Sequence, residues 1–274
     1  MNINTTITLN NQVQIPQLGL GVFKSEDGQE TYNAVRWALE AGYRHIDTAK
    51  AYGNEASVGK AIRESGIPRE QIFVTTKIWN PDQRADTQEQ ACYLSLKELG
   101  LEYLDLYLIH WPVKEKINET WTVMEKLYRS KLIRAIGVSN FNPHHLETLM
   151  TTAEIVPAVN QIELHPLLVQ TDVARYFSGK GIAVESWSPL GRGALLANPD
   201  IEAIAEVHGK TTAQIILRWH LQHGYVVIPK SVHKERIISN ADLYDFELTA
   251  DDMHAIDSMN KDFRYGPDPE TFNF

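Results

Sequence analysis

The chain has 274 residues, 43% of them hydrophobic, and a formal net charge of −9. The negative charge disfavours nonspecific binding to nucleic acid or to an anionic membrane. The single cysteine, Cys92, excludes a disulfide framework and a four-cysteine metal site within the chain. The first residues are polar, and no apolar run approaches the ~20 residues of a membrane helix. We therefore expect a cytoplasmic protein with no metal and no nucleic-acid or membrane partner.

Residues 6–15 predict a β-hairpin, because apolar and polar residues alternate on both sides of Asn10-Asn11. Eight strand–helix units follow. Strands are expected at 18–21, 43–47, 72–76, 104–109, 135–138, 158–163, 183–187 and 225–228. Helices are expected at 27–41, 55–65, 87–99, 118–130, from 143, from 171, at 201–208, 212–222, near 233–240 and at 250–259. A Pro-containing aromatic tail ends the chain.

Short, mostly apolar strands that alternate with helices are typical of a parallel sheet buried on both faces. Eight such units can close into a (β/α)8 TIM barrel. The alternative is an open doubly wound sheet that binds a dinucleotide. Gly19-Leu20-Gly21 does precede a helix, but Lys24 stands where the third glycine of that fingerprint belongs. We therefore predict one barrel domain over 1–274, with an N-terminal hairpin and with the C-terminal helix and tail over the barrel rim.

Four chemically useful side chains lie at or just after the ends of three successive strands: Asp47, Tyr52, Lys77 and His110. In a barrel these strand ends meet at one rim, where chemistry takes place. We expect Asp47 to hold Lys77 charged, and the ammonium to lower the pKa of Tyr52 from its usual ~10. Tyr52 would then give a proton to a carbonyl oxygen, and His110 would donate a hydrogen bond to the same oxygen.

Three stretches carry a close resemblance to the aldo-keto reductase family: 42–49 continuing to Gly59, 133–141, and 228–231 continuing to Arg236 and Asn240. The resemblance covers essentially the whole chain. It is strongest to the small bacterial diketogluconate and glyoxal or methylglyoxal reductases. It implies a barrel that binds NADPH without a Rossmann domain, and it places the family's catalytic tetrad on Asp47, Tyr52, Lys77 and His110.

The resemblance also implies cofactor contacts along the rim. Ser139, Asn140 and Gln161 match the binders of the nicotinamide carboxamide, and Trp187 stands where many members stack a tyrosine on the nicotinamide ring. The remaining matches are Val22 and Phe23 near the reaction centre, Ser188, Leu190 and Gly191 at the pyrophosphate, Lys230, Ser231, Val232 and Arg236 at the adenosine 2′-phosphate, and Asn240 at the adenine. Ser239 replaces an acid that many members have beside the adenine.

Aromatic residues follow several strands. Phe23, Trp79 and Trp111, with His110, predict an apolar slot for a small carbonyl substrate. Four tail aromatics are candidates to cover it: Phe263, Tyr265, Phe272 and Phe274. We expect a monomer.

The leading interpretation is an NADPH-dependent reductase of aldehydes and ketones, either small dicarbonyls such as methylglyoxal and glyoxal or keto sugars. A barrel aldolase or lyase that uses Lys77 as a Schiff base is an alternative, and it requires a neutral lysine. A noncatalytic NADPH-binding regulator is a third possibility.

Overall fold

The computed structural model describes residues 1–272, and eight parallel strands form the centre of this part of the chain. Their order in the sheet follows the sequence from β3 to β10. The strands are β3 (Leu20–Gly21), β4 (His45–Asp47), β5 (Phe73–Ile78), β6 (Leu104–Ile109), β7 (Ile133–Ser139), β8 (Val159–Glu163), β9 (Ala183–Trp187) and β10 (Val226–Val227). Parallel bridges join Leu18 to Val227 and Gly21 to Lys230, so the sheet closes on itself. The predicted barrel is confirmed.

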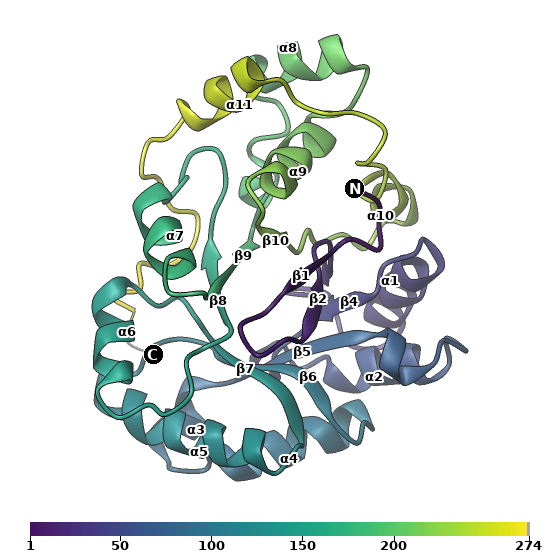
Figure 1. The fold of residues 1–274 in the computed structure, drawn as a ribbon. Helices are drawn as coiled ribbons and strands as arrows, with labels where there is room; N and C mark the ends of the chain where they lie inside the picture. The colour runs from purple at the N-terminus through teal and green to yellow at the C-terminus, as the bar shows by residue number, and fades with distance from the viewer. Residues whose placement is uncertain (273–274) are drawn as a thin grey trace.

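Helices surround the strands (Figure 1). They are α1 (Gln29–Glu40), α2 (Glu55–Arg63), α3 (Asn80–Arg84), α4 (Gln88–Leu99), α5 (Ile117–Arg129), α6 (Pro143–Met150), α7 (Thr171–Ser178), α8 (Pro199–His208), α9 (Thr212–Gln222), α10 (Lys234–Ser239) and α11 (Ala250–Asp257). Sequence analysis did not predict α3, which begins directly after β5 with Pro81 in its first turn. No helix within residues 1–272 combines the length and the hydropathy needed to cross a membrane.

Side chains alternate between the two faces of the strands. In β6, Leu106 and Leu108 pack inside the barrel, whereas Tyr107 and Ile109 pack outward among the helices. The hairpin of β1 (Thr6–Thr8) and β2 (Gln14–Pro16) adds Leu9 and Ile15 to the inner cluster. The hairpin therefore closes one end of the barrel (Figure 1), and each of these buried side chains contributes about 1.5–3 kcal/mol.

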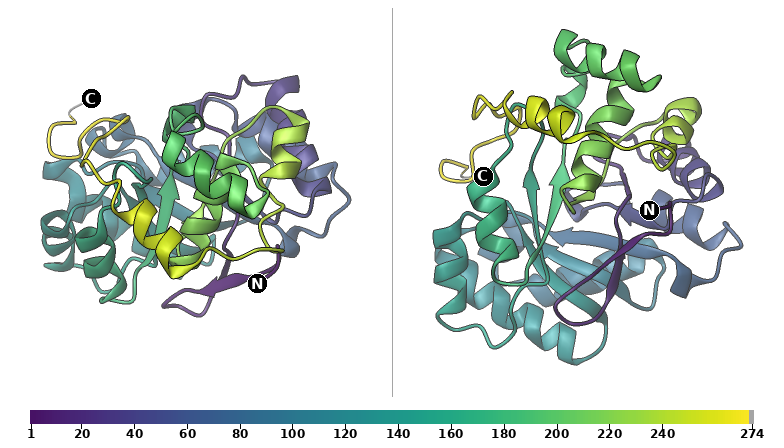
Figure 2. Two further views of the ribbon diagram at one scale, coloured as in Figure 1. Left: turned by 90° about the horizontal axis from the view of Figure 1, so that it is seen from above. Right: turned by 45° about the horizontal axis from the view of Figure 1, so that its top comes forward.

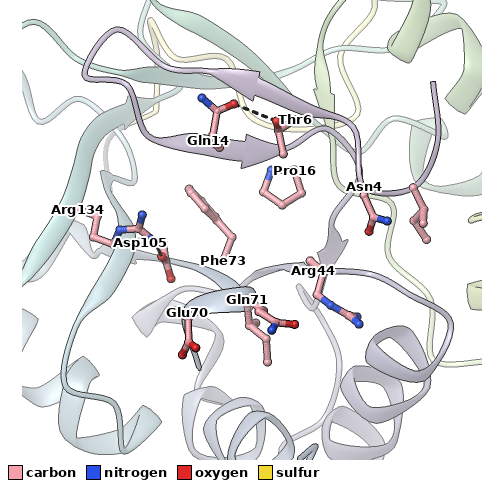
Figure 3. Close-up of a pocket in the computed structure, with 12 residues that line it drawn as sticks. Asn4, Thr6, Gln14, Pro16, Arg44, Glu70, Gln71, Phe73, Asp105 and Arg134 are labelled. Carbon is pink, nitrogen blue, oxygen red and sulfur yellow. Dashed lines mark hydrogen bonds and ion pairs between the residues drawn. The ribbon is translucent and has the colours of Figure 1, made fainter. Parts of the chain in front are cut away.

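A hollow of about 350 Å³ lies beneath this hairpin (Figure 3). Asp105 in its lining is 2.7 Å from Arg134, and also 2.7 Å from Arg69, which lies outside the lining. Asp105 also accepts a hydrogen bond from the Val74 backbone. Groups at this end of a barrel stabilise the fold, whereas chemistry occurs at the other end.

The C-terminal tail lies on the side of the molecule away from the hairpin (Figure 2). The backbone N–H groups of Lys261 and Phe263 both donate to the carbonyl oxygen of Leu167. Further along, the N–H groups of Tyr265 and Gly266 donate to the buried Glu163 carboxylate, at 2.7 and 3.1 Å. The tail is thus fastened to the C-terminal end of β8 and the loop that follows it. Phe274, one of the predicted covering aromatics, lies outside the described residues.

Candidate active site

A cavity of about 880 Å³ opens at the C-terminal ends of the strands. Most of the residues predicted from the sequence line it: Phe23, Asp47, Tyr52, Trp79, His110, Trp111, Ser139, Asn140, Gln161, Trp187, Ser188, Leu190, Lys230, Ser231, Val232, Arg236 and Asn240. Three predicted residues are outside the lining. Val22 is buried in the core, Gly191 packs beside Tyr265, and Lys77 lies beneath Tyr52. Neither the side chain of Val22 nor any atom of Gly191 therefore belongs to the cavity wall.

Lys77, on β5, is fully buried and its amine is surrounded by oxygen atoms. Its Nζ donates to both carboxylate oxygens of Asp47 at 2.7 and 2.8 Å, and to the carbonyl oxygen of Thr48 at 2.8 Å. Burial acts to lower the pKa of Lys77, but Asp47 and Tyr52 outweigh it and raise the pKa above its usual value. Lys77 is therefore a charged ammonium whose three hydrogen atoms are all donated to oxygen atoms. A Schiff base requires a neutral amine, so this arrangement disfavours the aldolase or lyase alternative.

Tyr52 ends a single 3₁₀ turn after β4, and Gly53 follows it with a φ of 68° that favours glycine. Its hydroxyl is 3.5 Å from Lys77 Nζ. Burial raises the pKa of Tyr52 to about 12, and the neighbouring ammonium only partly opposes this. The expectation of a net lowered pKa was therefore wrong, because the depth of burial outweighs the charge. At neutral pH the phenol keeps its proton and has it available to donate.

His110 follows β6, and its ring meets that of Tyr52 edge-on, with 5.7 Å between the ring centroids. Burial and the charge of Lys77 hold the pKa of His110 well below its usual value. The imidazole is therefore neutral and donates through one ring nitrogen only. Its Nδ1 has no hydrogen-bond partner among residues 1–272.

The amide and indole groups predicted to hold the nicotinamide form hydrogen bonds with one another. The Trp187 indole N–H donates to Asn140 Oδ1 at 2.8 Å, and Asn140 Nδ2 donates to the His110 carbonyl oxygen at 2.9 Å. Gln161 Nε2 donates to Asp47 Oδ2 at 2.8 Å and to Glu185 Oε2 at 3.0 Å. The hydrogen bond to Asn140 therefore fixes the indole ring of Trp187 in place.

Lys230 and Arg236, which follow β10, line the same cavity, are exposed and form no ion pair with an acid within the described chain. Several further cationic or polar residues of the lining were not predicted from the sequence, among them Lys24, Arg192 and Thr212. Arg192 carried a signal, because it lies inside the loop already assigned to the pyrophosphate.

Sequence analysis also missed Glu185, which is fully buried inside the barrel. A charged residue in the middle of an apolar strand was the available signal, because such residues are rarely buried without partners.

The tail reaches the cavity at two points, Pro267 and Phe272. Phe272 stacks on Trp111, with ring centroids 4.0 Å apart and planes 21° from parallel. Phe263 is half exposed and, like Tyr265, is not part of the lining. Of the described tail aromatics, Phe272 is therefore the one positioned over the substrate end.

Comparison with known proteins agrees with this geometry. The sequence model of the Aldo/keto reductase family matches residues 17–261. The chain is 54% identical to a glyoxal reductase of Bacillus subtilis over 273 residues, which cover 100% of this chain and 99% of that protein. It is 53% identical to a 9,11-endoperoxide prostaglandin H2 reductase of Trypanosoma cruzi, over 99% and 98% of the two chains. A Bombyx mori aldo-keto reductase solved in complex with NADP has a TM-score of 0.89 and 38% identity, over 96% of this chain and 95% of that chain. Full-length similarity of this kind shows that the chain is an oxidoreductase of the aldo-keto reductase family.

Proposed function

We propose that this enzyme uses NADPH to reduce small aldehydes and ketones to alcohols, with Tyr52 as the proton donor. The substrates we favour are dicarbonyls such as glyoxal and methylglyoxal, with keto sugars as the second class. One observation carries the proposal: a half-buried phenol that keeps its proton lines the cavity, and the ammonium beside it is held by a carboxylate. The phenol supplies the proton, and the ammonium stabilises the charge left when the proton is gone.

The lining fits NADPH from end to end. Gln161 has both amide hydrogens bound to carboxyl oxygens, so its free carbonyl oxygen suits the carboxamide of a nicotinamide. Trp187 offers an aromatic face at the same place. Lys230, Ser231 and Arg236 of the lining combine unpaired positive charge and a hydroxyl, which suits a phosphate on the adenosine ribose.

The bound cofactor supplies a hydride to the carbonyl carbon. The residues of the chain handle the developing negative charge on the oxygen. Tyr52 transfers its proton to that oxygen, and Lys77 compensates the phenolate that remains. His110, being neutral, donates a hydrogen bond that orients the oxygen without competing for the proton. Asp47 fixes the position of Lys77 through two hydrogen bonds.

The substrate end of the cavity is aromatic, with Phe23, Trp79, Trp111 and Phe272 around the tetrad. This lining excludes water and favours compact carbonyl compounds. We further propose that the enzyme acts as a cytoplasmic monomer, which size-exclusion chromatography with light scattering would test.

The test is NADPH consumption with glyoxal, methylglyoxal and keto sugars by the wild type, Tyr52→Phe and Tyr107→Phe. Tyr52→Phe should lower kcat by roughly 10²–10⁴-fold while NADPH affinity stays nearly unchanged. Tyr107 is the control, since it is a fully buried tyrosine that faces away from the cavity. A Tyr52→Phe enzyme with normal turnover would remove Tyr52 from the mechanism.

A further inference from the structure

Glu185 is a fully buried carboxyl that has no role in the mechanism described above. It lies in the middle of β9, where the adjacent Val184 packs outward among the helices. Side chains alternate along a strand, so the Glu185 carboxyl projects toward the barrel axis. A carboxyl in such a place is costly unless neighbouring groups bind it or it carries a proton.

One oxygen of Glu185 is bound and the other is not. Oε2 accepts the hydrogen bond from Gln161 Nε2 at 3.0 Å. Oε1 has no hydrogen-bond partner among residues 1–272, and it lies 3.7 Å from His45 Nε2. His45 cannot neutralise it, because burial lowers the pKa of that imidazole to about 3. Burial and the nearby Asp47 raise the pKa of Glu185 to about 8.

A chain of direct contacts links Glu185 to the proton donor. Gln161 Nε2 bonds to Glu185 on one side and to Asp47 Oδ2, at 2.8 Å, on the other. Asp47 binds Lys77, and Lys77 Nζ is 3.5 Å from the Tyr52 hydroxyl. The Gln161 amide cannot flip without losing both hydrogen bonds to carboxyl oxygens, so its carbonyl oxygen stays available to the cavity.

We propose that Glu185 is a positioning residue of this reductase: it locks the Gln161 amide in the orientation that receives the nicotinamide carboxamide, and its own proton controls the charge that Lys77 and Tyr52 experience. The inference rests on the proposed function. It links the cofactor-binding residue Gln161 to the proton donor Tyr52, a link that the four tetrad residues alone do not provide.

The direction of the effect follows from the charges around Glu185. The titratable groups that face it are Asp47 and His45 from β4, Lys77 from β5 and Tyr52 beyond them. The two strands beside β9 contribute no further charge. Gln161 from β8 is uncharged, and Val226, which is opposite Glu185 on β10, is apolar. When Glu185 loses its proton, two carboxylates oppose one ammonium, and the pKa of Tyr52 rises. Carbonyl reduction uses the protonated phenol and is little affected. Alcohol oxidation uses the phenolate as a base, so its pH profile moves to higher pH.

The first experiment therefore measures kcat for alcohol oxidation with NADP⁺ against pH in the wild type, Glu185→Gln and Glu55→Gln. Glu185→Gln keeps an acceptor oxygen for Gln161 but cannot ionise, so its apparent pKa should lie below that of the wild type. Glu55→Gln is the control, because Glu55 is also buried but bonds to Thr76 and Ser95, which lie outside the chain of contacts. If the Glu185→Gln profile coincides with that of the wild type, the electrostatic part of the proposal is refuted.

The second experiment measures NADPH binding by quenching of tryptophan fluorescence. Glu185→Leu removes one of the two acceptors of the Gln161 amide and leaves it held by Asp47 alone, so NADPH should bind about two- to tenfold more weakly. Glu185→Gln should bind as the wild type does. Wild-type affinity in Glu185→Leu would refute the positioning part.

An infrared titration of the cofactor-free enzyme separates this proposal from the proposed function. Between pH 7 and pH 9 the wild type should lose the infrared absorption band of one protonated carboxyl group. Glu185→Gln has no such group at this position, so its spectrum should not show this loss. If the band difference is present but the wild type neither binds NADPH nor reduces carbonyls, the proposed function fails while Glu185 still titrates. If the band difference is missing, Glu185 does not exchange its proton in this range and the proposal fails.

Discussion

Replacing Glu185 by glutamine should stabilise the fold, and the gain should grow as the pH rises. The native pKa of Glu185 is about 8, against an ordinary value of 4.5. Between these values the unfolded chain has lost the proton and the native chain has kept it. The native state then binds more protons, so wild-type stability falls as pH rises. Glutamine does not titrate and escapes this loss.

The size of the effect follows from about 1.4 kcal/mol for each unit of pKa displacement. The wild type loses about 1 kcal/mol by pH 5 and about 3 kcal/mol by pH 7 relative to a chain that does not titrate at this position. The stability difference between Glu185→Gln and the wild type should therefore grow by roughly 2.5 kcal/mol over this interval.

The assay is equilibrium unfolding in urea, followed by circular dichroism at pH 5, 6 and 7. Glu206→Gln, at an exposed position on α8, serves as the control for removing a carboxylate from the surface. A pH-independent difference between Glu185→Gln and the wild type would show that the native state does not hold a proton on Glu185. The buried, half-bound carboxyl of Glu185 would then be ionised in the native state at these pH values.

Three further predictions concern activity. Lys77→Met should lower kcat by at least about 10²-fold and raise the apparent pKa of the proton donor, because the ammonium lowers the pKa of Tyr52; an unchanged pH–rate profile would contradict this. Arg236→Ala should weaken NADPH binding about tenfold and leave NADH binding unchanged, with Lys234→Ala, on the same helix but outside the cavity lining, as the control; equal loss for both cofactors would argue against a phosphate site. Phe272→Ala should raise KM for carbonyl substrates more than it raises the Kd of NADPH, because it removes the stacking on Trp111; steady-state kinetics over several carbonyl compounds and a binding titration decide this.

The barrel could be predicted from hydrophobic periodicity. Each short apolar strand is followed by a helix, and both kinds of element are recognisable from the residues within them. The tetrad was also accessible, since barrel topology brings Asp47, Lys77 and His110 to one rim once their strands are identified. Their assembly with Tyr52 at that rim was therefore expected, while the roles of these residues remain predictions.

Other features depend on distances that a sequence does not contain. The pKa of Tyr52 is set by how deeply the hydroxyl is buried, and this outweighs the adjacent charge that the sequence did suggest. The hydrogen bond from Trp187 to Asn140 requires side chains from β9 and the end of β7 to meet across the rim. Helix α3 was missed because Asn80-Pro81, directly after a strand, is equally typical of a loop.

Closure of the barrel has a consequence for synthesis of the chain. The backbone N–H groups of Gly19 and Gly21 donate to the carbonyl oxygens of Val227 and Pro229, so the first strand pairs with a segment made near the end of translation. Until that segment emerges, one edge of β3 and one edge of β9 have no partner. Unpaired edges of a growing sheet invite pairing with other chains. The nascent enzyme is therefore most exposed to aggregation just before its last fifth emerges, and a chaperone that shields these edges would raise its yield at that stage.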